Sequence, residues 1–233
     1  NCRLEPYRVM TFVIFFAIQY ANRQLKTALA FDTSKNSMKD MMKSMIDLSG
    51  KTAIVTGGTR GLGRDIAVGL ASAGCAVWIC GRNAPDSVPD GVRFETCDIR
   101  DAEQAKAFVS KVAASSGSID ILVNNAGGAP PHDAAIASPR FAEALVRLNL
   151  LGPFYMAQAA YPPMARAGKG SIVNIASVSG ARPSPGTSIY GAAKAGLLNL
   201  TQSLAQEWGK DGIRVNAIIA GLMHTENAEA TYG

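Results

Sequence analysis

A short apolar strand that runs directly into a glycine-rich turn and a helix constrains this chain more than any other feature. The segment 51–56 is apolar and β-branched, as buried strands are. Glycines follow at 57, 58, 61 and 63, before a helical pattern that runs to about Ala73. In such a strand–turn–helix unit, bare backbone amides and the positive end of the helix dipole can face a pyrophosphate. We therefore predict a nucleotide cofactor bound by Thr56, Gly57, Thr59, Arg60, Gly61, Leu62 and Gly63.

The rest of the chain alternates strand and helix patterns. Further strands are predicted at 76–80, 93–99, 119–123, 172–176 and 213–219. Helices are predicted at 101–115, 138–164 and 188–208, the second of them as one helix or as two broken around Gly152-Pro153. This alternation predicts an α/β fold: a Rossmann-like, doubly wound parallel sheet with helices on both faces. A length of 233 residues permits one such domain, which we place at 48–233.

The end of the second predicted strand bears on which dinucleotide is bound. NAD-preferring sites usually carry Asp or Glu there, but this chain has Gly81 followed by Arg82. The guanidinium groups of Arg60 and Arg82 suit a 2′-phosphate, although either side chain alone could simply be solvated. We therefore favour NADP(H) and keep NAD(H) open. Other expected cofactor contacts are Asp98 and Ile99, near the adenine, and the turn Asn125, Ala126 and Gly127.

Three side chains with complementary acid–base properties are expected to converge where strand 172–176 ends. Tyr190 and Lys194 are four residues apart, so they project from one face of the predicted helix 188–208. A free phenol has a pKa of ~10, and a nearby cation lowers it by ~1–3 units, which makes the phenol a usable proton donor and acceptor. Ser177 follows the strand and can hold the reacting oxygen. On its own, this spacing also fits an ordinary surface Tyr and Lys.

Composition excludes several other classes of function. A net charge of +5 with no basic stripe argues against nucleic-acid binding. Cys2, Cys75, Cys80 and Cys97 lack metal-binding or disulfide-like spacing, so we expect reduced thiols, no metal site and a cytoplasmic location.

Residues 1–47 differ in character from the rest. Their apolar run, Val9 to Ile18, is about half the length that a membrane-spanning helix needs. We predict that this segment is an extension outside the catalytic fold, either a leader or an over-extended reading frame. Attachment to a membrane is a minor alternative.

Together these motifs resemble the short-chain dehydrogenase/reductase family from Leu48 to about Thr225. The Thr56–Gly63 turn looks like the cofactor turn of the family, and the Asn124–Gly127 turn looks like its sheet-stabilising turn. Its catalytic tetrad corresponds to Asn149, Ser177, Tyr190 and Lys194. It implies that Tyr190 is the acid/base, Ser177 polarises the substrate oxygen, Lys194 binds the nicotinamide ribose and lowers the phenol pKa, and Asn149 holds a relay water. Gly221 and Thr225 would contact the cofactor, although Ala220-Gly221 replaces the usual Pro-Gly.

The same resemblance predicts a homodimer or homotetramer, and a C-terminal truncation, since the usual last strand and substrate loop would follow Thr225. The sheet would then have an open edge and a poorly enclosed substrate site.

The predicted activity is NADPH-dependent reduction of a carbonyl, a 3-oxoacyl compound or another ketone, to an alcohol. An NAD(P)-dependent alcohol, sugar or steroid dehydrogenase is the alternative within the class. A catalytically idle NADP(H)-binding protein is the alternative outside it. The sequence does not identify the substrate.

Overall fold

The computed structural model describes residues 46–221, which contain a six-stranded sheet and its covering helices. The strands are β1 (Thr52–Thr56), β2 (Ala76–Gly81), β3 (Val92–Thr96), β4 (Ile121–Asn124), β5 (Gly170–Ser177) and β6 (Ile213–Ala220). The α-helices are α3 (Gly61–Ser72), α4 (Ala102–Ser116), α5 (Pro139–Val146), α6 (Gly152–Ala167), α7 (Val178–Ala181) and α8 (Ser188–Trp208). A π-helical turn, η1 (Arg147–Leu151), joins α5 to α6, and a 3-10 turn, η2 (Gly209–Asp211), follows α8.

All neighbouring strands of the sheet are parallel, in the order β3-β2-β1-β4-β5-β6. The chain moves outward in one direction from β1 to β3 and in the other from β4 to β6. The order therefore reverses between β1 and β4, and open α/β sheets bind ligands outside the carboxyl ends of the strands at such a point. The predicted doubly wound parallel sheet is confirmed.

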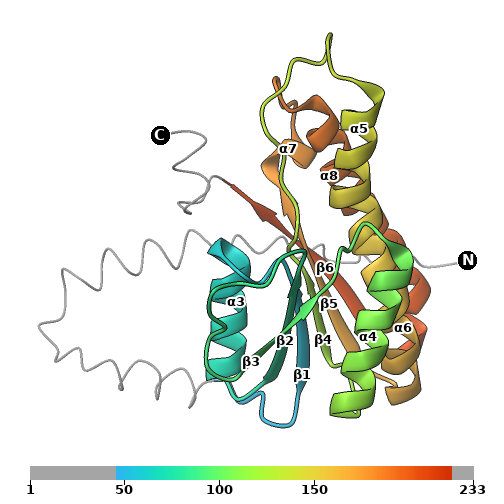
Figure 1. Cartoon of the computed structure of the whole chain (residues 1–233). Coiled ribbons are helices and arrows are strands. Elements are labelled where there is room, and N and C mark those ends of the chain that lie inside the picture. Colours follow the sequence, from blue (N-terminus) through green and yellow to red (C-terminus); the bar gives the residue numbers. More distant parts are fainter. Residues whose placement is uncertain (1–45, 222–233) are drawn as a thin grey trace, which may run out of the picture. The chain divides into compact units, whose positions relative to one another are not determined.

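Helices cover both faces of the sheet, as predicted (Figure 1). On one face α3 packs over β1, β2 and β3, where Ala67 meets Val55, Val77 and Ile79 in a buried cluster. On the other face α4, α6 and α8 enclose a larger core built around Phe108, Met164, Leu204 and Ile172. Local signals set the helix ends. The carboxylate of Asp101, for example, accepts the amides of Glu103 and Gln104 at the start of α4.

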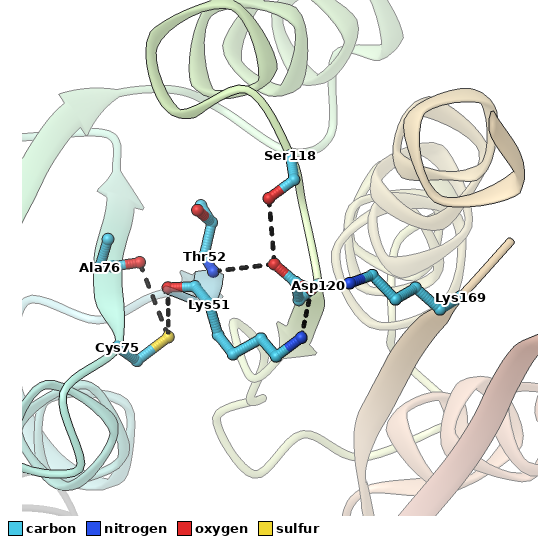
Figure 2. Close-up of polar contacts among 7 residues, drawn as sticks. All are labelled: Lys51, Thr52, Cys75, Ala76, Ser118, Asp120 and Lys169. Atoms are coloured by element: carbon cyan, nitrogen blue, oxygen red, sulfur yellow. Dashed lines mark hydrogen bonds and ion pairs between the residues drawn. The ribbon is translucent and has the colours of Figure 1, made fainter. Parts of the chain in front are cut away.

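A buried carboxylate ties the strands together at the amino end of the sheet (Figure 2). Asp120, just before β4, accepts a hydrogen bond of 3.1 Å from the Thr52 amide on β1 and another of 3.1 Å from the Ser118 hydroxyl. The ammonium groups of Lys51 and Lys169 lie 3.2 and 3.6 Å from it. Burial raises the pKa of Asp120, but these donors outweigh burial and hold the pKa below its usual value. The ion cluster therefore aligns β1 and β4, the strands that flank the reversal point.

The structure departs from the predicted elements in three places. β3 ends at Thr96, so Asp98 and Ile99 lie in the loop beyond it, where the Asp101 amide bonds back to the Asp98 carbonyl. The segment 138–164 is broken just before Gly152, which agrees with the predicted alternative of two helices, but the π-helical turn η1 that joins them was not predicted. The serine- and glycine-rich stretch after β5 forms the short helix α7, which was not predicted.

Within residues 46–221, no helix is both long enough and apolar enough to cross a membrane. In the same range, no group of three or more His, Cys, Asp and Glu side chains could hold a metal ion. The apolar run Val9 to Ile18, Thr225 and any strand beyond β6 lie outside the described residues. The domain boundary at 47/48 and the predicted truncation therefore stay predictions.

Candidate active site

Most of the predicted site residues in the described part of the chain lie at the carboxyl ends of β1, β4 and β5 and at the start of α8, whereas Arg82 follows β2, Asp98 and Ile99 follow β3, and Asn149 lies in η1. β1 leads into the glycine turn, β4 into the Asn125–Gly127 turn, and β5 ends on Ser177. Tyr190 and Lys194 lie in the first two turns of α8. Gly221 follows β6 directly.

The glycine turn is packed so tightly that side chains would not fit in it. A Cβ on Gly63 would lie 2.3 Å from the Gly57 carbonyl oxygen and 2.4 Å from Asn125 Nδ2. Gly57 itself has a φ of 64°, in the left-handed region that favours glycine. At Gly57 and Gly63 the turn therefore brings bare backbone to the start of α3.

The start of α3 is suited to an anion. Its N-cap residue, Arg60, makes no side-chain capping bond, and the first turn carries no acidic side chain. In contrast, Asp101 caps α4 and Ser138 caps α5. Amides at an uncapped helix start combine with the helix dipole to favour a phosphate group, so this cradle fits the pyrophosphate of a dinucleotide.

Gly63→Ala is expected to raise the Kd for NADPH by at least about tenfold, because the new methyl group must push the Gly57 carbonyl out of the turn. Fluorescence titration with NADPH measures this change. Gly69→Ala, in the same helix but with nothing within 4 Å of the added Cβ, is the matched control and should bind normally. Wild-type affinity in the Gly63 variant would contradict the assignment of this turn to the cofactor.

Hydrogen bonds join the Asn125–Gly127 turn to the end of β1. The Asn125 and Ala126 amides both donate to Thr56 Oγ1, each at 3.0 Å. In return, Asn125 Nδ2 donates to the carbonyls of Thr56 and Gly57, at 3.0 and 3.3 Å. Thr56 is fully buried, so its side chain supports the two turns from beneath. These contacts hold the two turns in fixed relation across the reversal point.

At the predicted adenosine end, two arginines are exposed and an aspartate is already paired. Arg60 and Arg82 are solvent-exposed, beside the glycine turn and the end of β2. Asp98 is bound by Arg100, with Nε 2.9 Å from Oδ1 and Nη2 2.5 Å from Oδ2, and this pairing lowers the pKa of Asp98. Ile99 is 4% exposed and packs against Gly152. The Asp98 carboxylate, predicted to contact the adenine amino group, is therefore already held by Arg100, a pairing that the sequence did not indicate.

Asn149 lies in the π-helical turn and is fully buried. Its Nδ2 donates to the carbonyls of Gly128 and Leu145, each at 3.0 Å, and its Oδ1 accepts the Gly128 amide at 2.9 Å. A Cβ on Gly127 would lie 2.7 Å from this Oδ1 and 3.1 Å from Lys194 Nζ. The Asn149 side chain therefore docks the 127–128 turn beside the lysine. That it also orders a relay water stays a prediction.

Lys194 connects α8 to the end of β5. Its Nζ donates a 2.7 Å hydrogen bond to the Ile175 carbonyl and lies 5.8 Å from the centroid of the Tyr190 ring. The side chain is 3% exposed, and burial lowers the pKa of Lys194 to about 8. The desolvated ammonium is thereby fixed near the Tyr190 phenol. Its acceptor, the Ile175 carbonyl, lies two residues before Ser177 in β5.

The Ser177 hydroxyl is 9% exposed and caps α7. Its Oγ accepts a 3.2 Å hydrogen bond from the Ser179 amide, which leaves its own O–H able to donate. A hydroxyl held in this way can polarise a carbonyl oxygen.

Two loops, one after the Asn125–Gly127 turn and one before α8, are linked to each other. The 128–138 loop and the 182–187 loop are joined by a 2.8 Å hydrogen bond from the His132 amide to the Gly186 carbonyl. The His132 ring lies 4.5 Å from that of Phe141, at the start of α5. That these two loops shape the substrate pocket stays a prediction.

Comparison with known proteins agrees with this arrangement. A family model described as short chain dehydrogenase matches residues 51–232. The chain is 37% identical over 197 residues to 2-dehydro-3-deoxy-D-gluconate 5-dehydrogenase of Escherichia coli, covering 81% of this chain and 78% of that protein. It is 35% identical over 190 residues to 3-oxoacyl-[acyl-carrier-protein] reductase FabG of Staphylococcus aureus, covering 77% of each.

The fold has solved relatives too. A short-chain dehydrogenase from Streptomyces avermitilis matches with a TM-score of 0.72 and 34% identity, over 76% of this chain and 68% of that one. Fold and site thus define an oxidoreductase that acts on CH–OH or C=O groups with NAD(P). The chain belongs to the short-chain dehydrogenase family.

Proposed function

We propose that the protein is an NADPH-dependent reductase that converts a ketone, such as a 3-oxoacyl compound, into an alcohol. NADPH, when bound, would supply the hydride that reaches the carbonyl carbon. Ser177 would donate a hydrogen bond to the carbonyl oxygen, and the Tyr190 hydroxyl would give that oxygen its proton. The Lys194 ammonium would stabilise the phenolate left behind and bind the nicotinamide ribose.

The observation that carries this proposal is the hydrogen bond from Lys194 Nζ to the Ile175 carbonyl, at 2.7 Å. It ties the helix that bears Tyr190 to the strand that ends on Ser177, so the proton donor and the polarising hydroxyl belong to one rigid arrangement. Gly127, in the turn proposed for the cofactor, lies against the same ammonium group. The site therefore combines acid–base groups with a cradle for a dinucleotide.

A panel of carbonyl compounds and alcohols, followed by NADPH absorbance, tests the proposal. We expect NADPH oxidation with at least one ketone, and preferential use of NADPH over NADH. NADP(H) binding without turnover on any member of the panel would instead indicate a catalytically idle nucleotide-binding protein.

The oxidative direction is the second candidate. The E. coli relative is named a dehydrogenase of a keto sugar acid, which favours an alcohol or sugar substrate oxidised with NAD(P). Faster turnover of an alcohol with NADP⁺ than of any ketone with NADPH would favour this alternative.

The preference for NADPH is proposed to depend on Arg82 and Arg60. Arg82→Ala is expected to raise the Kd for NADPH by about 10- to 150-fold, because a charge-assisted pair with the 2′-phosphate contributes about 1.5–3 kcal/mol. The Kd for NADH, which lacks that phosphate, should change less than about twofold. Arg214→Ala, on an exposed position of β6, is the control. Equal losses for both nucleotides would show that Arg82 does not read the phosphate.

The oligomeric state and the cellular location of the protein are proposed from its resemblance to the family. We propose a homodimer or homotetramer in the cytoplasm, with a small carbonyl or alcohol compound as substrate. Cys75, Cys80 and Cys97 are buried free thiols, in keeping with a reducing compartment. Light scattering on the purified protein tests the oligomeric state.

A further inference from the structure

We infer that Gly180 and Gly191 are positioning residues of the active site, because together they seat the helical turn that begins at Ser177 directly on the backbone of α8. This fixes the Ser177 hydroxyl relative to the Tyr190 phenol. The inference deepens the proposed function and rests on it for the role of the two side chains.

Gly180, in α7, lies in backbone contact with α8. A Cβ at Gly180 would stand 2.6 Å from the carbonyl carbon of Lys194 and 2.8 Å from the amide nitrogen of Ala195. These atoms belong to a helix backbone and cannot rotate away as a side chain could. An alanine at this position must therefore push α7 and α8 apart.

Gly191, in α8, makes the reciprocal contact. A Cβ there would stand 2.8 Å from the Ser179 carbonyl oxygen. Neither Gly180 nor Gly191 has a positive φ, so the backbone conformation at these positions does not require glycine. In a helix, alanine is ordinarily favoured over glycine. The space between α7 and α8 is therefore what excludes a side chain at the two positions.

The seating of α7 matters because Ser177 caps this helix. The Ser177 hydroxyl accepts the Ser179 amide, so the oxygen moves when α7 moves. Hydroxyl contacts continue from Ser179 to Ser184, at 3.0 Å, and from Ser184 to Thr187, at 2.6 Å, which brings the chain back to the start of α8. α7 is thus held on α8 through Ser179 and Gly180, the latter against the backbone of Lys194, one turn from Tyr190.

A double-mutant cycle between Gly180→Ala and Ser177→Ala tests the inference. We expect Gly180→Ala to lower kcat by at least about tenfold while the Kd for NADPH stays within about twofold of wild type. If Gly180 acts through Ser177, adding Gly180→Ala to the Ser177→Ala variant should cost less than about a further twofold. Losses that multiply, or a Gly180 variant with wild-type kcat, would overturn the inference.

Gly191→Ala and Gly69→Ala complete the set. A methyl group at Gly191 meets the Ser179 carbonyl oxygen at 2.8 Å and the Ser184 Cβ at 3.4 Å, so Gly191→Ala should lower kcat with little loss of stability, measured by thermal unfolding. Gly69→Ala, which meets nothing within 4 Å, should leave kcat unchanged. A Gly191 variant with wild-type kcat would contradict the inference even if the Gly180 variant does not fold.

Crystal structures separate this inference from the proposed function. In the Gly180 or Gly191 variant, α7 should be displaced from α8 while the glycine turn at 57–63 keeps its place. An undisplaced α7 would refute the positioning role. A wild-type protein that turns over no carbonyl or alcohol, yet shows this displacement in the variant, would refute the proposed function instead.

Discussion

Tyr190→Phe is expected to lower kcat by about 10²–10⁴-fold, the usual contribution of a positioned proton donor. The phenyl ring keeps the shape of the side chain and its place near Lys194 Nζ, but it has no proton to give. Because the proposed role of Tyr190 lies in the chemical step, the Kd for NADPH should stay within about twofold. Steady-state kinetics with a ketone from the panel and fluorescence titration with NADPH measure the two quantities.

Tyr161→Phe is the matched control for this substitution. Tyr161, on α6, donates to Asp211 at 3.0 Å and stacks on Trp208, away from the catalytic set. The control should keep its kcat. Full turnover in the Tyr190 variant, or an equal loss in both variants, would show that the phenol of Tyr190 is not the proton donor.

Lys194→Met is expected to stop turnover and to change how stability depends on pH. Burial lowers the pKa of Lys194 to about 8 in the folded protein, whereas the ordinary value is 10.5. Below about pH 8 the lysine is charged in both states, and the cost of desolvating its charge lowers the stability of the folded protein in full. Between about pH 8 and 10.5 the unfolded chain binds more protons than the folded protein, so the free energy of unfolding rises with pH. The free energy of unfolding of wild type, relative to the variant, should therefore rise by up to about 3 kcal/mol from about pH 7 to about pH 10.

Urea unfolding of both proteins across this pH range measures the difference. The lost hydrogen bond to the Ile175 carbonyl lowers the stability of the variant by an amount that does not vary with pH, so only the slope reports the titration. Lys210→Met, at an exposed position in η2, is the matched control, because it removes a lysine that is not buried. A flat difference for Lys194 would mean that its ammonium is not desolvated in the folded state.

The parts of the fold that local chemistry determines were predictable from sequence. β1, its glycine turn and α3 follow from one apolar run and closely spaced glycines. α8 was predicted from Ser188 to about Trp208, the bounds that it has, because a pattern rich in Ala, Leu and Gln begins there, after Pro185 and Gly186. The convergence of Ser177 and Lys194 at the end of β5 also followed, since parallel strands end at one edge of the sheet.

Features that depend on contacts between distant segments could not be predicted in this way. α7 exists because its glycine fits against the α8 backbone, a contact that no local propensity records. The π-helical turn at Asn149 accompanies hydrogen bonds to Gly128, 21 residues away. The pairing of Asp98 with Arg100 is local. On sequence grounds, however, the Arg100 guanidinium could equally have paired with Asp101 or been solvated.

The hydrogen bond between His132 and Gly186 has a consequence for how such an enzyme could diversify. The loops that it joins carry none of the groups proposed for proton transfer or for the dinucleotide. Changes of shape and polarity there can alter which compound is accepted while the reaction itself is conserved. One scaffold can in this way serve many metabolites, with selectivity held in two adjoining loops and reactivity held in the strand end and the helix that carry Ser177, Tyr190 and Lys194.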